Sequence, residues 1–154
     1  MSAPAATEFG RCRERLERAV GACRPAGDWA GNVSRTIAAT IEFAAADPAA
    51  ALTLTERASS RWREREPEFV AMVEHFARLL DRGAPPRNPR LPDAPAVVAR
   101  IARQLNLQIE AGRTGETTEL VPDLTFLALM PYLGFAGARQ RAEPATAATL
   151  RSSP

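Results

Sequence analysis

The sequence predicts an all-α fold, a single bundle of about six helices. Apolar residues recur at intervals of three and four along most of the chain, which is the spacing of one helix face. The composition is rich in Ala, Leu, Arg and Glu, whose side chains lose little conformational freedom in a helix. No segment shows the alternation of apolar and polar residues that is typical of a strand.

The chain is long enough for one domain with its own core. Its 154 residues are 45% hydrophobic and 25% charged, which are ordinary values for a globular protein. We predict a frayed N-terminus over 1–7, a helical domain over 8–142 and a disordered tail over 143–154, where the residues are small and polar.

The charge and the hydropathy pattern exclude some classes of partner. A formal net charge of +2 is too small to predict a nucleic-acid or membrane partner. No apolar leader follows Met1, and no stretch reaches the ~20 apolar residues of a membrane span. We therefore expect a cytoplasmic protein.

Turn and cap residues divide the first half of the chain into three helices. The first covers 8–23 and is followed by a Pro-Gly turn. Asp28 is the expected N-cap of the second, which runs to 46. Asp47 and Pro48 form a strong start signal for a third helix, which is expected to end near Ser60.

Three further helices are expected in the second half. A break at Pro67 precedes an apolar stripe that Gly83 ends. Five prolines in the twelve residues 84–95 predict a loop. Asp93 caps the fifth helix, which ends at Gly112, and a polar turn covers 113–119. Pro122 opens the sixth helix, and Pro131 is expected to kink it.

The sixth helix predicts a protein partner. Its side chains are apolar around the whole axis from 120 to 135, and Asp123 is its only charged residue there. Such a helix must be covered on every side, and five other helices of a small domain cover one side. We therefore predict a two-fold symmetric homodimer through the fifth and sixth helices. The alternative is a central helix in a monomer. The predicted interface residues are Ile101, Leu105, Leu124, Leu127 and Tyr132.

Large apolar side chains on the second to fourth helices predict a ligand site inside the bundle, because such sites are mostly apolar with few polar anchors. Thr40, Gln104 and Gln108 are the candidate anchors, and Gln108 lies closest to the stripe of the fifth helix. The alternatives are plain core for the apolar residues and, for Gln108, a buried amide that sets the dimer register. The predicted apolar lining is Phe43, Leu54, Trp62, Phe69, Met72 and Phe76.

No motif predicts an enzyme, a metal site or a cofactor. His75, the only histidine, lies on the flank of its stripe, and no nucleophile is suggested by its spacing. We interpret it as a boundary residue with one edge in water. Arginines flank Trp62, but the interleaved glutamates favour a solvated face over a nucleic-acid platform.

The order of these features resembles the TetR family of transcriptional regulators. The run AADPAAAL at 45–52, after a helix that begins at Asp28 and Trp29, is similar to the middle of that family's C-terminal domain. The run VPDLTFLALMPYLG at 121–134 is similar to its final dimerisation helix, and PYLG is the most specific part. The resemblance covers about 8–142. It implies an all-helical domain that binds a small molecule and forms a homodimer through its last two helices.

The chain departs from the family at its start, because no helix-turn-helix domain precedes Phe9. We therefore predict a ligand-binding, dimerising domain without its own DNA contact. Pairing with a full-length relative would weaken that relative's hold on DNA, since two heads are needed for two half-sites. The alternative is a structural or interaction module with a filled core. A natural loss of the head and a start assigned too late both stay open, and the intact mass of the native protein distinguishes them.

Overall fold

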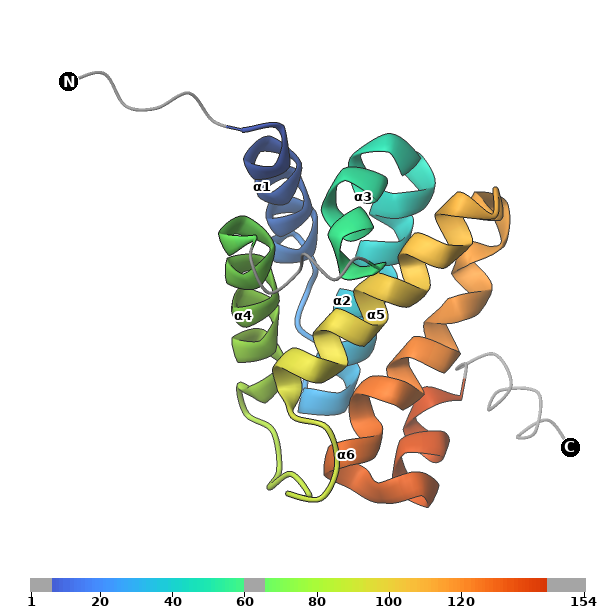
Figure 1. Ribbon diagram of the computed structural model, residues 1–154. Helices are drawn as coiled ribbons and strands as arrows, with labels where there is room; N and C mark the ends of the chain where they lie inside the picture. Colours follow the sequence, from blue (N-terminus) through green and yellow to red (C-terminus); the bar gives the residue numbers. More distant parts are fainter. Residues whose placement is uncertain (1–6, 60–65, 144–154) are drawn as a thin grey trace, which may run out of the picture.

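The fold is that of an all-α bundle, as the sequence predicts. The structure is a computed structural model of the chain. It describes residues 7–59 and 66–143 (Figure 1). The predicted frayed N-terminus up to residue 6 and the predicted tail from residue 144 lie outside the described residues. Six α-helices and no strand are present in the described part of the chain. Their bounds are Glu8–Gly21 (α1), Trp29–Ala46 (α2), Pro48–Thr55 (α3), Pro67–Asp81 (α4), Ala94–Glu110 (α5) and Leu120–Ala142 (α6).

The predicted N-caps hold three of these helices. The carboxylates of Asp28, Asp47 and Asp93 each accept a hydrogen bond from the backbone N–H three residues on, at 2.8, 3.1 and 3.1 Å. These bonds satisfy one of the unpaired N–H groups with which every helix begins. Gly83 and Gly112 follow the ends of α4 and α5 with φ of 76° and 71°, a conformation that strongly favours glycine.

Several helix ends differ from the predictions. Helix α1 ends at Gly21 and not at 23, and α6 begins at Leu120 and not at Pro122. The third helix does not remain α-helical to Ser60: α3 ends at Thr55 and continues as a 3₁₀ turn over Glu56–Ser59. The turn predicted over 113–119 is a 3₁₀ helix, Thr114–Glu119, that leads directly into α6. Tightened turns of this kind are common at helix ends, where few i→i+4 partners remain.

The break in α6 lies at Gly134, and the prediction of a kink at Pro131 is wrong. Gly134 has φ 74° and ψ 174°, whereas Pro131 lies within regular helix. The carbonyl of Pro131 accepts a hydrogen bond of 2.8 Å from the N–H of Asn88, so the loop after α4 is tied to this point. After Gly134 the chain turns, and the last segment of α6 folds back beside the first part (Figure 1).

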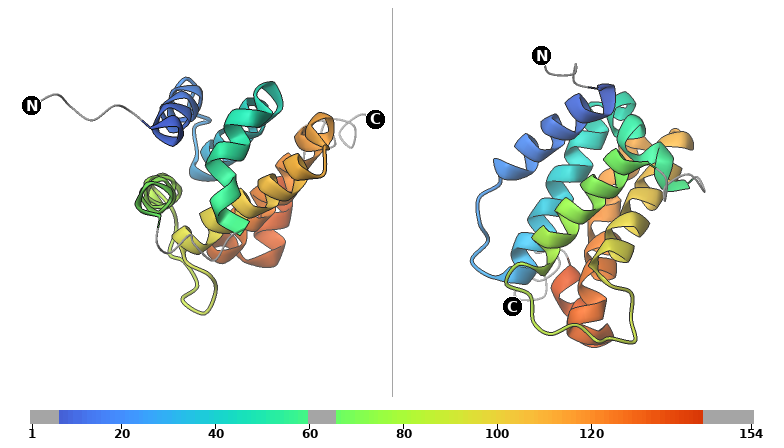
Figure 2. Two further views of the ribbon diagram at one scale, coloured as in Figure 1. Left: turned by 45° about the horizontal axis from the view of Figure 1, so that its top comes forward. Right: turned by 60° about the vertical axis from the view of Figure 1, so that its left-hand side comes forward.

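The core has two parts, and α4 and α5 contribute buried side chains to both. In one, α2 packs lengthwise against α6, and the buried side chains include Ile41, Leu124 and Leu129. In the other, α1, α3 and α4 surround a smaller cluster that includes Phe9, Leu54 and Phe69. Figure 2 shows α1 and α4 on the side of the molecule away from α6. Helix α1 packs against α2 and α3 and barely touches α4.

Polar contacts fix one end of the α2–α6 pair. The phenol of Tyr132 donates to the Asp81 carboxylate at 2.6 Å, and the indole N–H of Trp29 donates to the carbonyl of Leu80 at 2.7 Å. The two rings meet edge to face with centroids 4.9 Å apart. Arg141 binds the carboxylate of Asp28, so the folded-back end of α6 is held to the start of α2. Three helices are therefore joined at this end.

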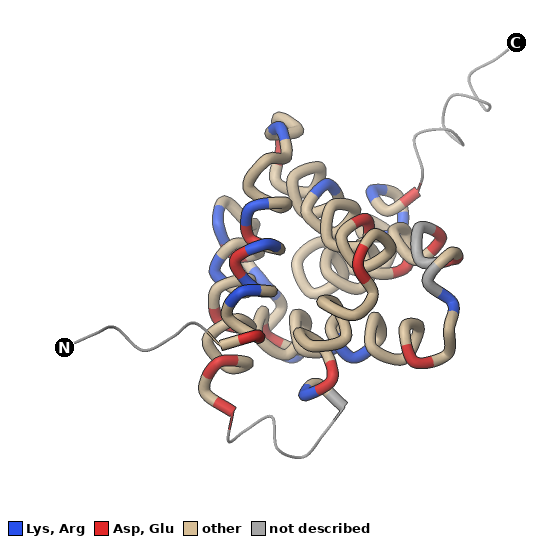
Figure 3. Tube along the Cα trace, turned by 90° about the horizontal axis from the view of Figure 1, so that it is seen from above, with Lys and Arg blue, Asp and Glu red and all other residues tan. Residues whose placement is uncertain are grey.

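The surface of α1 is strongly charged. Four arginines and three glutamates lie on this helix, and residues of both signs follow one another along it (Figure 3). Its buried side chains, Phe9, Cys12 and Leu16, lie on the opposite face. Helix α1 is thus an amphipathic cover on one side of the bundle.

Candidate functional site

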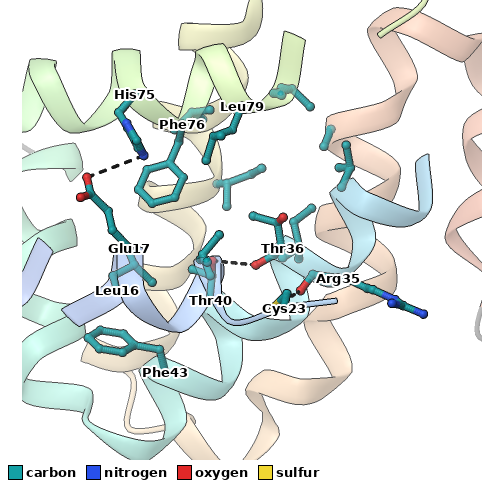
Figure 4. Close-up of a pocket in the computed structure, with 18 of the residues that line it drawn as sticks. Leu16, Glu17, Cys23, Arg35, Thr36, Thr40, Phe43, His75, Phe76 and Leu79 are labelled. Atoms are coloured by element: carbon teal, nitrogen blue, oxygen red, sulfur yellow. Dashed lines mark hydrogen bonds and ion pairs between the residues drawn. The ribbon is translucent and has the colours of Figure 1, made fainter. Parts of the chain in front are cut away.

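A cavity of about 590 Å³ lies inside the half of the bundle that contains α1 and α4. Its walls come from α1, α2, α4 and α5, with smaller contributions from α3 and from Ala128 of α6. Figure 4 shows side chains of α1, α2 and α4 around this space. The cavity exists because α1 and α4 lie on either side of it without packing closely against each other.

The wall formed by α3, α5 and α6 is almost entirely apolar. Its one polar side chain is Thr55, whose hydroxyl donates to the carbonyl of Ala51 at 2.9 Å and lies 3.2 Å from the amide oxygen of the buried Asn106. That hydroxyl is buried and lies within hydrogen-bond distance of both Ala51 and Asn106, so this wall offers a ligand mainly apolar contact area. The apolar lining of this wall is Ala51, Leu54, Val98, Ile101, Ala102, Leu105 and Ala128.

The wall formed by α2 is different. Asn32, Thr36 and Thr40 line the cavity at intervals of four residues, so they follow one face of the helix. Figure 4 shows Thr36 and Thr40 beside the space, with the Thr40 hydroxyl donating to the Thr36 carbonyl at 2.8 Å. Cys23, after the end of α1, lies nearby, and its thiol is 3.8 Å from the carbonyl of Ala19. The polar groups of the cavity are therefore concentrated on one side.

His75 and Glu17 connect α4 to α1 at one end of the cavity (Figure 4). The imidazole Nε2 lies 3.7 Å from a carboxylate oxygen of Glu17, and the same oxygen accepts a hydrogen bond of 2.7 Å from Arg13. The ring of His75 also meets Phe76 edge to face at 5.2 Å. The carboxylate is thus already compensated by an arginine, and the pair closes part of the gap between the two helices.

Four of the six apolar residues predicted to contact a ligand do line this cavity: Phe43, Leu54, Met72 and Phe76. Phe69 does not. It is buried with Phe9 and Ala58 beyond the end of the cavity, at the start of α4, where these side chains fill the space. Trp62 lies outside the described residues.

Thr40 is the one predicted polar anchor that reaches the cavity. Gln104 and Gln108 are half-buried on α5 but do not line it, so the choice of Gln108 as anchor does not fit this structure. Leu105 occupies the lining position on that part of α5 instead. Sequence reasoning missed Thr36, although it lies one turn before Thr40 on the same face. It also missed Glu17 and Cys23, because ligand contacts were expected only from the second to fifth helices.

Three of the five predicted interface residues lie in the interior of the single chain. Leu105, Leu124 and Tyr132 are buried by α2 and its neighbours, so they are not available to a partner, and their prediction is corrected here. Ile101 is half-buried and lines the cavity. Leu127 is half-buried on α6 and keeps part of its surface open. Helix α6 is apolar as predicted, but the residues that remain partly exposed on it differ from those that the sequence predicted.

The outward surface of α6 carries an apolar patch. Phe126, Leu127, Met130 and Leu133 are each half-buried, and Phe135 is 64% exposed. The rings of Phe126 and Phe135 meet edge to face across the break at Gly134, with centroids 5.4 Å apart. We call these five residues the α6 patch.

Helix α6 also passes a length and hydropathy test for a membrane span, the one single helix of the described residues to do so. A third of its most apolar window is buried, and core helices of soluble proteins pass the same test. Helices α2 and α3 pass it only when they are joined, across a bend of 117°. Among the described residues, no group of three His, Cys, Asp or Glu side chains has the arrangement of a metal site.

Comparisons of the chain with protein-family models, with curated proteins and with solved structures found no match.

Proposed function

We propose that this chain is a regulatory domain of TetR type that binds a small, largely apolar molecule and forms a homodimer. The observation that carries the proposal is the cavity of about 590 Å³. Ligand sites are concave, mostly apolar and measure roughly 300–1,000 Å³, and this cavity, which is partly open to solvent, has these properties. A space of this size and lining is therefore typical of a binding site.

The resemblance to TetR-type regulators agrees with this placement. It implies a ligand held inside a helical cage, and here the cage consists of the helices that precede α6. The described residues include no helix-turn-helix, and the proposal assigns them no contact with DNA. A domain of this kind would act in the cytoplasm, and it would weaken DNA binding by a full-length relative if the two formed a mixed dimer.

A thermal-shift titration with a panel of apolar compounds tests the binding half of the proposal. A ligand that binds only the folded state raises stability by RT ln(1 + [L]/Kd), about 2.7 kcal/mol at a concentration of 100 Kd. We expect a saturable rise in Tm with at least one compound. No rise with any compound of a broad panel would favour the alternative, a structural or interaction module that takes no ligand.

The α6 patch supports the dimer half of the proposal. Its residues are apolar, contiguous and partly open, and monomers rarely leave such a patch uncovered. A second copy of the chain that applies the same patch would form an isologous, two-fold interface. Sedimentation velocity of the wild-type chain is expected to show a dimer.

Leu127→Glu tests this interface, since its side chain lies in the patch and is not fully buried in the chain itself. We expect the variant to sediment as a folded monomer, because a carboxylate placed in an apolar interface has no partner. Gln140→Glu, at an exposed position on the last turns of α6, adds the same charge outside the patch and is expected to leave the dimer intact. A wild-type chain that stays monomeric at high concentration would contradict the interface.

A further inference from the structure

The two walls of the cavity differ enough to indicate the chemical class of the ligand. We propose that it is an uncharged molecule with an apolar body and hydroxyl or carbonyl groups along one edge, and that this edge lies on Thr36 and Thr40 of α2. The inference rests on the proposed ligand-binding function, and it adds what the ligand carries and which residues select it.

The first step is the hydrogen-bonding state of the α2 wall. The hydroxyl of Thr36 forms no hydrogen bond with any described residue. The hydroxyl of Thr40 uses its proton on the Thr36 carbonyl and keeps its lone pairs. The amide oxygen of Asn32 accepts from the N–H of Ala26 at 2.6 Å, and the NH₂ group of Asn32 has no partner among the described residues. This wall therefore offers both a donor and acceptors to a ligand.

The second step is the spacing of these groups. Thr36 and Thr40 are four residues apart on one helix, which corresponds to about 6 Å along the axis. A molecule that satisfies both carries two oxygen atoms at about that separation on the same edge. The opposite wall provides mainly apolar contact, so the rest of the ligand is mainly apolar.

The third step is the state of the charged groups. The carboxylate of Glu17 is paired with Arg13 and also faces His75. The charges of Glu17 and Arg13 therefore compensate each other and are not open to a ligand. The guanidinium of Arg35 donates to the carbonyls of Arg24 and Pro25 and points away from the cavity in Figure 4. Arg24 and Arg82 also border the cavity, but both are exposed at its rim. A charged group that entered the interior would therefore lose its hydration without gaining a counter-charge there, and that loss is costly. The cavity thus favours a neutral molecule.

A set of compounds with one apolar body and three head groups tests this inference. The neutral fluorophore N-phenyl-1-naphthylamine reports occupancy of the cavity, and 1-decanol, decanoate and decylammonium compete with it at a pH of about 8, where the last two are charged. We expect 1-decanol to displace the fluorophore at a concentration at least about tenfold lower than either ion.

Thr36→Val separates hydrogen bonding from apolar contact, because the two side chains have nearly the same shape. We expect it to raise the inhibition constant of 1-decanol about fivefold, the effect of one hydrogen bond, after correction for the fluorophore affinity measured on the same variant. Thr53→Val is the matched control: Thr53 lies on α3 and does not line the cavity, and its hydroxyl donates to the carbonyl of Ala49 at 3.1 Å.

The outcomes separate this inference from the function on which it rests. Absence of fluorophore binding would overturn both. Fluorophore binding with decanoate as the better competitor would overturn the neutral class alone, and would assign the head group to Arg24 and Arg82, the exposed arginines at the rim. An unchanged response of Thr36→Val to 1-decanol would overturn the role of Thr36.

Discussion

The two halves of this bundle are both lined by apolar side chains, but one half is closely packed and the other contains a cavity. Where α2 packs against α6, side chains such as Leu129 are completely buried and the space between the helices is filled. Where α1 and α4 face each other, side chains such as Leu79 border a cavity of about 590 Å³. Both halves share α2, which contributes Ile41 to the filled core and Thr36 to the cavity wall.

The two halves differ in packing because different helices face α2 in each. Helix α6 lies along α2 and is fixed at one end by Tyr132 and Arg141, so its side chains meet those of α2 directly. Helix α1 is connected to α2 by a short turn and is charged on its outer face. It meets α4 at only a few points, where the Thr7 hydroxyl donates to the Glu68 carboxylate and where Glu17 faces His75. One half therefore provides stability, and the other keeps room for a ligand at a cost in packing.

The largest expected effect is a loss of stability from a single truncation in the filled half. Leu129→Ala leaves a void where the side chain is completely buried, and we expect a loss of about 3–4 kcal/mol in the free energy of unfolding. Leu79→Ala removes the same atoms from the cavity wall, where they are already half exposed, and should cost about 1 kcal/mol. Urea denaturation measures both. Equal losses would contradict the distinction between the halves.

A second substitution at Leu79 fills the cavity and does not enlarge it. Leu79→Trp adds volume where space is open, so stability should change by less than about 1 kcal/mol, whereas overpacking a filled core costs about 1–3 kcal/mol. We expect the affinity for N-phenyl-1-naphthylamine to fall about tenfold or more, since a filled pocket excludes the probe. Fluorescence titration measures the affinity, with Arg78→Trp, on the exposed face of the same helix, as the control. Unchanged binding would place the probe outside this cavity.

The sequence predicted the helices well because their signals are local. Asp28, Asp47 and Asp93 cap helices in the structure as predicted, since a cap needs only the backbone three residues away. The break in α6 was misplaced from Gly134 to Pro131. At Gly134 the helix is interrupted, and the carbonyl of Pro131 bonds instead to the N–H of Asn88 in the loop after α4, a contact between segments remote in sequence that local signals do not predict.

The cavity could be predicted only in part. Apolar spacing identifies which face of a helix is turned inward, and so it identified Phe43 and Phe76. Apolar spacing does not indicate whether the facing helix fills the space. That depends on the crossing angle and the distance between helices that are remote in sequence. For that reason Phe69 was taken for a lining residue, and Leu124 for an interface residue, although both are buried core.

Tyr132→Phe tests the contact that fixes the filled half. The variant keeps the ring but loses the hydrogen bond of 2.6 Å to Asp81, and we expect a loss of about 1 kcal/mol at neutral pH. Burial, and then the Asp81 carboxylate, raise the pKa of the Tyr132 phenol. An unfolded tyrosine loses its proton near pH ~10, so this contribution is present below that pH and declines as the pH rises further. Urea denaturation at neutral and alkaline pH should show the two proteins converging; a constant difference would exclude the phenol as the cause.

The smallest expected effect comes from an ion pair in each half, and it tests whether charge contributes to the difference. Asp47 caps α3 and pairs with Arg15 of α1 at 2.8 Å, while Asp28 caps α2 and pairs with Arg141 of α6. In each case the backbone N–H bond, and then the arginine, lower the pKa of the carboxyl. The stabilisation is therefore present above the ordinary value of about 3.9 and is lost as the pH falls through the lower folded value.

Asp47→Asn and Asp28→Asn keep a capping oxygen and remove the charge. We expect each variant to show a slightly reduced free energy of unfolding at neutral pH and to match the wild type in strong acid. The control is Asp93→Asn, because Asp93 caps a helix but has no ion pair among the described residues. Acid titration of stability measures all three. Similar small effects at 28 and 47 would leave packing as the cause of the difference between the halves. A much larger effect at 47 would instead mean that the Arg15 pair holds α1 in place over the cavity, and then a ligand that displaces α1 would compete directly with that pair.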